Sequence, residues 1–319
     1  MRILFTFSGE VVGPSDQEIL RRLEKCDREG FWLEMQDPDE ADYSLLLDVF
    51  HYHPLTVEDI QQQNARPKLE QYSGYLFAIV FTAHLDGRLL SYQEHHLYFS
   101  KNALVTVHHG PAPELAALLD RFRKTPDVTQ QDPSFLEYLV VNELTDGMFS
   151  VLDQLDERID ALEDQIIERP NSRTMSQIYK LKHDVIELRR ILGAQREVFQ
   201  HLVTHAVQYK TEETSVYYRD VYDHVVRQYE TVDSLRDLLT GSMDVYLSTV
   251  SNRLNISIRQ LTVVASLFLP LTFLTGFFGM NFAFLVGKIT SVQAFAGGVG
   301  LMVTSILVQL YIFRIRGWI

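Results

Sequence analysis

Oxygen-bearing and small side chains recur at helical spacing toward the end of the chain, and the pattern ends at Asn281. Counting back from Asn281, by five residues to Gly276 and then in steps of three and four, gives Thr272, Leu269, Ala265, Leu261 or Thr262, Ile258, Asn255, Ser251, Ser248 and Asp244. On an α-helix these residues share one face. Amide and hydroxyl oxygens suit a hard, hydrated cation, and Ile258, Leu261 and Leu269 would form apolar constrictions that gate by dewetting.

Two arrangements explain this stripe of residues. Several copies of the helix around a symmetry axis would enclose a pore, which one helix alone cannot do. The alternative is a seam between two membrane helices, where small residues are common. The residues of the stripe leave both interpretations open.

The sequence gives little support to an enzyme. It has no GxxxxGK[ST], HExxH, GxSxG or CxxC motif, and its single cysteine, Cys26, excludes an intrachain disulfide. Of the 11 histidines, His201 and His205 stand four residues apart on a predicted helix and could chelate a metal. Without a third ligand nearby such a pair is usually solvated, so a histidine-based metal hydrolase is the weakest hypothesis.

Two long uncharged segments close the chain. Residues 260–287 and 289–313 contain no charged side chain over 28 and 25 residues, and each exceeds the roughly 20 residues that cross a bilayer. A pair of buried core helices is the alternative, which two successive runs of this length disfavour. We therefore expect two transmembrane helices, at about 261–284 and 290–313.

Flanking cations predict the orientation of these spans. Arg253 and Arg259 precede the first span, Arg314 and Arg316 follow the second, and only Lys288 lies between them. The positive-inside rule places both termini in the cytoplasm, in a multi-pass protein of the cell membrane. The start of the chain is too short and too soon interrupted by a charge for a signal peptide. The formal net charge of −13 argues against nucleic acid as a partner.

The rest of the chain predicts an α+β cytoplasmic domain followed by long stalk helices. Residues 1–131 form the α/β domain, 132–259 the long-helix stalk and 260–319 the membrane domain. Apolar, β-rich runs at residues 43–50, 75–84, 95–99 and 103–108 predict strands, and residues 15–29 and 112–124 predict helices. Three long helices follow, with a break at Pro170-Asn171, and the third runs from about residue 214 into the membrane.

The first two long helices have opposite charge. Residues 146–168 contain eight acids and one base, whereas residues 173–196 contain six bases and two acids. An antiparallel hairpin with complementary solvated faces is the simpler interpretation, and an acidic lever that attracts cations is the functional one.

The string PLTFLTGFFGMNF, with Gly279-Met280-Asn281 at the outer end of the first span, resembles the signature of CorA-type divalent cation transporters. The strings HPLTVEDIQQQNARPKLEQYSGYLF (53–77), YYRDVYDHV (217–225) and DVYLSTVSNRLN (244–255) extend the resemblance over nearly the whole chain. It implies a funnel-shaped homopentamer with a pore lined by the first span and an outer ring of second spans. A divalent cation would then be the transported ion and also a regulatory ion, and the resemblance implies no enzymatic cofactor.

The resemblance also implies roles for individual residues. Asn281 would hold the hydrated ion at the outer mouth, and Gly279 and Met280 would shape the turn there. Further positions inferred to face the pore are Asn255, Leu261, Leu269 and Thr272, with Asp244 in an acidic ring lower in the stalk. Asp220 would belong to an intersubunit metal-sensing site that holds the closed state.

Two departures from the family pattern bear on the ion. Mg²⁺-selective members carry an acid just after GMN, where this chain has FAFLVGKITS with Lys288. At the sensing site, where relatives have an acid, this chain has His84, with Asp86 two residues on, and histidine suits Zn²⁺, Co²⁺ or Ni²⁺ better than Mg²⁺. A zinc-preferring transporter and a non-conducting, membrane-anchored, metal-responsive scaffold therefore remain alternatives to a Mg²⁺, Co²⁺, Ni²⁺ or Zn²⁺ channel.

Overall fold

The computed structural model shows two compact units. It describes residues 1–6, 9–25, 30–63, 65–101, 103–124, 133–168, 170–205, 212–281, 286–287 and 291–318. The first unit comprises Met1–Gln165 and Asn171–Ser242, and the second comprises Ile166–Pro170 and Met243–Ile319.

A seven-stranded sheet forms the centre of the first unit, with strand order β2-β1-β3-β7-β6-β5-β4. The strands are β1 (Arg2–Thr6), β2 (Gly9–Val12), β3 (Phe31–Gln36), β4 (Lys68–Tyr72), β5 (Tyr75–Asp86), β6 (Leu89–Ser100) and β7 (Ala103–His108). Strands β3 and β7 pair in parallel, and every other recorded pair is antiparallel. The predicted strands at 75–84, 95–99 and 103–108 are confirmed within β5, β6 and β7.

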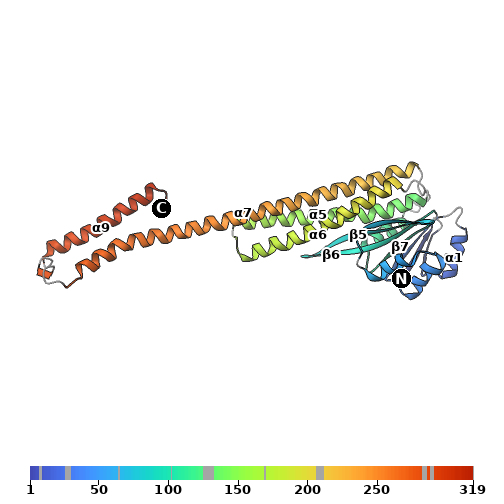
Figure 1. Ribbon diagram of the computed structural model, residues 1–319, viewed down its shortest axis with the longest axis horizontal. Helices are drawn as coiled ribbons and strands as arrows, with labels where there is room; N and C mark the ends of the chain where they lie inside the picture. Colours follow the sequence, from blue (N-terminus) through green and yellow to red (C-terminus); the bar gives the residue numbers. More distant parts are fainter. Residues whose placement is uncertain are drawn as a thin grey trace. The chain divides into compact units, whose positions relative to one another are not determined.

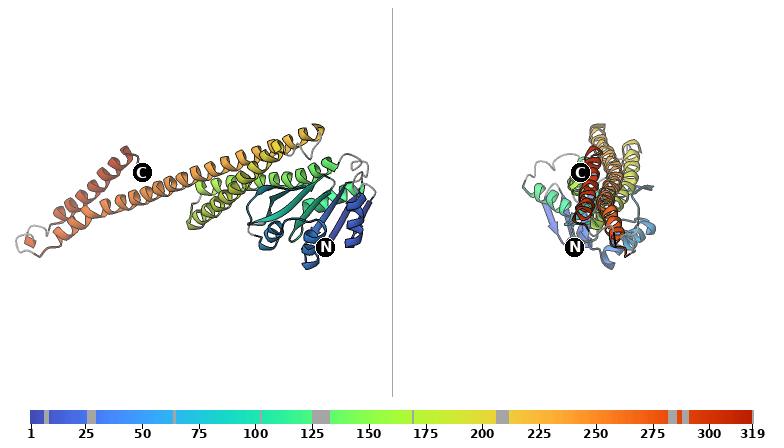
Figure 2. Two further views of the ribbon diagram at one scale, coloured as in Figure 1. Left: turned by 45° about the vertical axis from the view of Figure 1, so that its right-hand side comes forward. Right: turned by 90° about the vertical axis from the view of Figure 1, so that its left-hand side faces the viewer.

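Helices cover both faces of this sheet (Figures 1 and 2). Because side chains alternate along a strand, β5 sends Phe77 and Ile79 into one core and Ala78 and Val80 into the other. The first core is closed by α1 (Asp16–Lys25), α2 (Glu40–Ser44), the π-helical turn η1 (Leu45–Val49) and α3 (Pro54–Gln62). The second is closed by α4 (Pro113–Lys124), α5 (Pro133–Glu168), α6 (Ser172–His205) and the first part of α7 (Glu212–Phe278).

The strand predicted at residues 43–50 is wrong, because a capped helix starts just before it. The Asp39 carboxylate accepts hydrogen bonds from the backbone amides of Ala41 and Asp42, and the Asp42 carboxylate accepts one from the Asp39 amide. The Arg2 guanidinium also donates to Asp42, which anchors this turn to β1. A capping box of this kind stabilises a helix start by about 1 kcal/mol, which outweighs the weak strand preference of the residues that follow.

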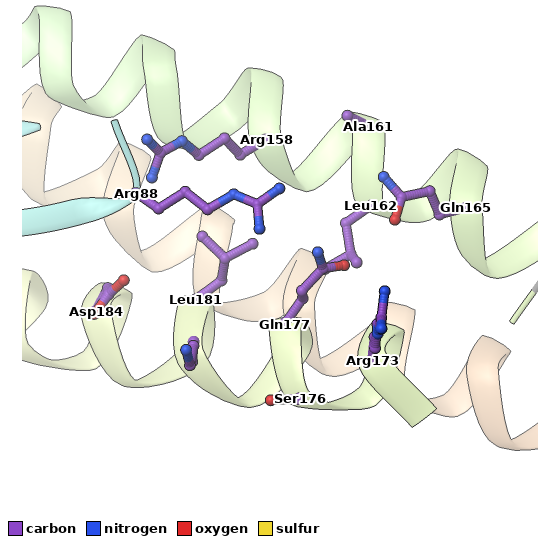
Figure 3. A pocket seen from close by; sticks show the side chains of 11 residues that line it. Arg88, Arg158, Ala161, Leu162, Gln165, Arg173, Ser176, Gln177, Leu181 and Asp184 are labelled. Carbon is purple, nitrogen blue, oxygen red and sulfur yellow. The ribbon is translucent and has the colours of Figure 1, made fainter. Parts of the chain in front are cut away.

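The three long helices and the break between the first two are confirmed. At the start of α6 the Asn171 side-chain oxygen accepts hydrogen bonds from the amides of Arg173, at 2.8 Å, and Thr174, at 3.1 Å. A cavity of about 420 Å³ lies in the first unit between α5, α6 and the turn that joins β5 to β6 (Figure 3).

The second unit contains the apolar part of α7 and the helix α9 (Val292–Ile315). Both are long and apolar enough to cross a membrane, with mean hydropathies of 2.0 and 1.8 in their most apolar windows, and neither window is buried. The first apolar helix ends at Phe278, earlier than the predicted limit near residue 284, and Ser291 caps α9 by accepting a hydrogen bond from the Ala294 amide.

We expect Phe122→Ala to lower the free energy of unfolding by about 3–5 kcal/mol, because a buried aromatic ring leaves a cavity when it is truncated. Phe122 is 1% exposed, and its ring centroid lies 5.2 Å from Phe5 and 6.3 Å from Trp32. Chemical unfolding at fixed protein concentration measures the change. Leu89→Ala, at a residue that is 71% exposed, is the control and should stay within about 0.5 kcal/mol. An equal loss in both variants would contradict the assigned core.

Candidate ion pathway and metal-binding residues

The predicted stripe on α7 is exposed along its length in the single chain. Leu269 is 72% exposed, Leu261 70% and Ile258 52%, and the other members from Asp244 to Asn281 are exposed as well. The partly buried positions of the same segment fall on the opposite side of the helix, at residues 263, 266, 267, 270, 271 and 274. Near its end α7 contacts α9, where the Phe278 ring lies against Gly298. Along the apolar part of α7 the stripe therefore faces away from α9.

The two threonine hydroxyl groups of the stripe are arranged as acceptors. The Thr262 hydroxyl donates to the Ile258 carbonyl at 2.8 Å, and the Thr272 hydroxyl donates to the Phe268 carbonyl at 2.9 Å. Since each proton is used within the helix, the oxygen lone pairs remain for a partner outside it. This polarity suits a cation or the hydrogens of its water shell.

The GMN triplet forms the end of the apolar helix. The Gly279 amide donates to the Thr275 carbonyl at 2.9 Å, and the Met280 amide donates to the Phe277 carbonyl at 3.3 Å. A Cβ on residue 279 would lie 3.1 Å from the Thr275 carbonyl oxygen, so the close turn favours glycine. Asn281 follows as an exposed residue beyond the last turn. Residues 282–285 and 288–290, which include Lys288, lie outside the described residues, as does Cys26.

The three predicted sensing residues do not meet within one chain. Asp220 on α7 is exposed, and its carboxylate lies 3.8 Å from the His224 ring. His84 on β5 instead contacts Glu114 at 3.6 Å and the Thr82 hydroxyl at 3.3 Å. Asp86 ends β5 as an exposed residue. Across the part of the chain that the structure describes, no group of three or more His, Cys, Asp or Glu side chains is arranged to hold a metal ion.

The sequence interpretation missed two residues beside Asp220. The His224 Nδ1 atom lies 2.8 Å from the Asp146 carboxylate of α5, and that carboxylate accepts a hydrogen bond from Asn142 at 2.8 Å. Asp220 and His224 stand four residues apart in the string RDVYDH, which was a readable signal. Asp146 is separated from them by more than 70 residues, and only the folded chain brings it to His224.

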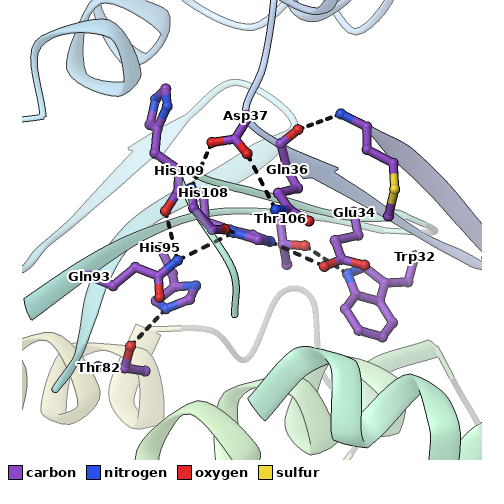
Figure 4. A network of polar contacts seen from close by, with 12 residues as sticks. Trp32, Glu34, Gln36, Asp37, Thr82, Gln93, His95, Thr106, His108 and His109 are labelled. Atoms are coloured by element: carbon purple, nitrogen blue, oxygen red, sulfur yellow. Dashed lines mark hydrogen bonds and ion pairs between the residues drawn. The ribbon is translucent and has the colours of Figure 1, made fainter. Parts of the chain in front are cut away.

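Two histidines of the sheet, His95 and His108, are buried and contact neighbouring polar side chains (Figure 4). The His108 ring contacts the buried Glu34 carboxylate at 3.1 Å, and His95 contacts the Thr82 hydroxyl at 3.0 Å. Burial holds the pKa of His95 well below its usual value, so this ring stays neutral. His201 is exposed on α6, and the side chain of His205 lies outside the described residues.

Glu94 and His96 are neighbours on β6, with the His96 side chain buried and the Glu94 side chain partly buried. Their closest side-chain atoms are 3.7 Å apart, which is too long for a good hydrogen bond. Burial raises the pKa of Glu94 to about 7, although a hydrogen bond from the Ala65 backbone acts to lower it. Burial lowers the pKa of His96 to about 3. The short distance between a carboxyl and an imidazole here does not indicate an ion pair.

Comparison with known proteins identifies the chain. Residues 27–315 match the family model described as CorA-like Mg2+ transporter protein. The chain belongs to this family. It is 30% identical over 94% of its length to a putative metal ion transporter, YfjQ, of Bacillus subtilis, of which it covers 93%. It is 34% identical over 74% of its length to the cobalt/magnesium transport protein CorA of Thermotoga maritima, of which it covers 68%.

The fold agrees with this assignment. The complete structure of the CorA magnesium transporter from Methanocaldococcus jannaschii superposes with a TM-score of 0.82 and 23% identity, over 100% of this chain and 99% of that one. The predicted α/β domain, long helices and two C-terminal apolar helices are confirmed. Because CorA-like proteins are transporters of divalent cations, the chain is a membrane transporter and not an enzyme.

We expect Glu94→Gln to gain stability relative to the parent as the pH rises from 5 to 8. A carboxyl whose folded-state pKa is about 7, against an ordinary 4.5, binds a proton more tightly when folded. The contribution of the Glu94 carboxyl to the free energy of unfolding is therefore largest below pH 4.5 and is lost as the pH rises through 7. The glutamine amide in the variant remains neutral at every pH, so the variant avoids a loss of stability on the order of 1–2 kcal/mol.

Thermal unfolding of the two proteins across this pH range measures the difference. Glu58→Gln controls for the removal of one charge, since Glu58 is an exposed residue of α3. A constant difference between Glu94→Gln and the parent at all pH values would refute the raised pKa.

Proposed function

We propose that the chain assembles into a homopentamer in the cell membrane and passes Mg²⁺, Co²⁺, Ni²⁺ or Zn²⁺ through a pore lined by α7. The observation that supports this most is the exposed stripe from Asp244 to Asn281, which faces away from α9. Apart from Asp244 at its start, the residues of this stripe carry no charge. In a lipid-facing helix these polar positions would be costly, whereas lining a water-filled channel satisfies them.

Each part of the stripe has a role in this proposal. A ring of Asn281 amides at the outer mouth, shaped by Gly279 and Met280, binds the hydrated ion through its water shell. Rings of Thr272 and Asn255 oxygens replace bulk water further in. Leu269, Leu261 and Ile258 narrow the path with apolar side chains that close when water leaves them. Asp244 then attracts the ion toward the cytoplasm.

The distribution of charge supports inward movement of cations. Three cations and no acid follow Arg259, so residues 1–259 carry a formal charge of −16 within the net −13. The flanking arginines favour an orientation with both termini in the cytoplasm. A strongly negative region on the cytoplasmic side of a pore attracts cations and repels anions.

The same assembly would complete the metal-sensing site. We place an α/β domain at 1–131, a stalk at 132–259 and a membrane domain at 260–319, with Asp220 on the stalk near the His84 and Asp86 edge of a neighbouring copy. Asp220 is 60% exposed, which leaves its carboxylate accessible to a second subunit. A cation shared there reduces repulsion between acidic subunits and stabilises the closed state.

Zinc is the second candidate ion. The segment after Asn281 carries Lys288 and no acid, and histidine at position 84 is a better ligand for Zn²⁺ than for Mg²⁺. A neutral to basic outer loop does not concentrate Mg²⁺, so selectivity would depend on the pore itself.

We expect Asn281→Ala to lower Mg²⁺ uptake into proteoliposomes at least about tenfold, because the outer ring loses its amide ligands. Gln293→Ala, the same loss of an exposed amide on α9, is the control and should keep uptake within about twofold. Flux equal to wild type in Asn281→Ala would count strongly against the outer ring.

Uptake of Mg²⁺, Co²⁺, Ni²⁺ and Zn²⁺, each with and without a pH gradient, separates the two candidate ions. Faster Zn²⁺ than Mg²⁺ transport supports the zinc-preferring transporter. Absence of uptake for all four ions, with metal still changing the shape of the oligomer, would support the non-conducting scaffold instead.

We expect Asp220→Asn to remove more than about half of the thermal stabilisation that millimolar Mg²⁺ gives the detergent-solubilised oligomer. A ligand that binds only the native assembly raises its stability by mass action, and the amide binds Mg²⁺ more weakly than the carboxylate. Asp237→Asn, another exposed aspartate of α7, is the matched control. Equal loss in both variants would exclude a specific role for Asp220.

A further inference from the structure

The opposite charges of α5 and α6 do not neutralise each other. Among the described residues no ion pair joins the two helices, although α5 is acidic and α6 is basic. On α6, Arg189 pairs with Asp233 of α7 at 2.6 Å, and Arg190 pairs with Glu187 of its own helix at 2.8 Å. The expected hairpin with complementary solvated faces is therefore not joined by ion pairs between α5 and α6 in the part of the chain that the structure describes.

The unpaired cations gather around the cavity between α5, α6 and the β5–β6 turn. Arg88 reaches it from the turn, Arg158 from α5, and Arg173 and Lys180 from α6. Within the described residues none of these four side chains lies within 4 Å of a carboxylate, and Asp184 is the one acid in the lining. The cavity has a formal charge of +3 in a chain whose net charge is −13.

Two guanidinium groups share the upper part of this cavity. Figure 3 shows the Arg88 and Arg158 side chains toward the Asp184 end of the lining, with Arg173 at the opposite end. Gly87, with φ of 55°, makes the tight turn that directs Arg88 over the helices. Two like charges in this position repel each other unless an anion lies between them.

The remaining lining limits the size and shape of a ligand. Leu162 and Leu181 form an apolar surface, and the side-chain amides of Gln165 and Gln177 lie beside it (Figure 3). Partial burial raises the pKa of Asp184, although the nearby charges of His183, Arg158 and Lys180 oppose this shift. At about 420 Å³ the cavity falls in the range of small-molecule sites and exceeds the space that one phosphate fills.

We propose that this cavity binds an oligophosphate anion, with a nucleoside triphosphate as its natural form. Guanidinium groups hold phosphate oxygens through paired hydrogen bonds, and four cations match the charge of a triphosphate. The leucines offer a flat apolar surface to a base, and the two glutamine amides can donate to and accept from its edge. The site is separate from the ion pathway and does not depend on transport.

Titration of the full-length protein in detergent, in buffer without divalent cations, tests the site with adenosine triphosphate and with inorganic triphosphate. We expect dissociation constants below about 1 mM, weakened at least tenfold in Arg88→Gln/Arg158→Gln and weakened by added salt. The control Arg190→Gln/Lys124→Gln removes two exposed cations elsewhere and should bind as the parent does. Arg158→Lys keeps the charge without the paired geometry and should give an intermediate affinity.

The two probes also distinguish the source of recognition. Tighter binding of adenosine triphosphate assigns a role to the base, and equal binding assigns the affinity to the phosphates. Absence of binding below about 1 mM, or equal weakening in the cavity and control variants, overturns the proposal. Dissociation of the oligomer by Arg88→Gln/Arg158→Gln on size-exclusion chromatography also overturns it, because the cavity would then hold an acidic surface of a neighbouring copy. Circular dichroism confirms that each variant is folded.

Discussion

The lack of hydrogen-bonding partners in a lipid bilayer is the constraint on which the membrane part of this protein depends. Between Arg259 and Lys288 the chain must satisfy its backbone polar groups internally, and α7 does this as one helix to Phe278. The side chains that remain polar, such as Thr262 and Thr272, return their protons to the helix. These two threonines leave only their oxygen lone pairs for a partner outside the helix. A helix that is stable in lipid thus gains a face that favours cations without carrying a charge.

A different rule governs the polar groups inside the first unit. There the sheet buries Glu34, His95, His96 and His108, and each is neutral or contacts a specific partner. The Trp32 ring nitrogen, for example, donates to the Thr106 hydroxyl at 2.9 Å between two parallel strands. Such contacts join strands that are far apart in the sequence. They favour one strand order over others that would bury the same apolar area.

The elements that could be predicted are those whose pattern is local. Strand β7 and the long helices follow directly from apolar periodicity and from the break at Pro170-Asn171. Strand β3 could not be found in this way, because Glu34 interrupts its apolar run and becomes acceptable only when His108 lies beside it. The helix at 40–49 was missed because its start depends on a capping contact. Among the site residues, the stripe to Asn281 is readable as a helical period, but the contact between Asp146 and His224 requires the tertiary fold.

Net charge by itself is a poor guide to what this chain attracts. The first 259 residues are strongly acidic, yet the cavity beside α5 and α6 is locally positive, and the ion pathway is neutral between its acidic end and Asn281. Because screening limits the range of a charge to about 8 Å in physiological salt, each region presents its own potential. In the proposed pore, the acidic exterior would concentrate cations, and neutral oxygens along α7 would let them pass without being held. Strong carboxylate ligands along such a pore would bind a divalent ion too tightly for it to leave, so the proposed pathway separates attraction of the ion from its conduction.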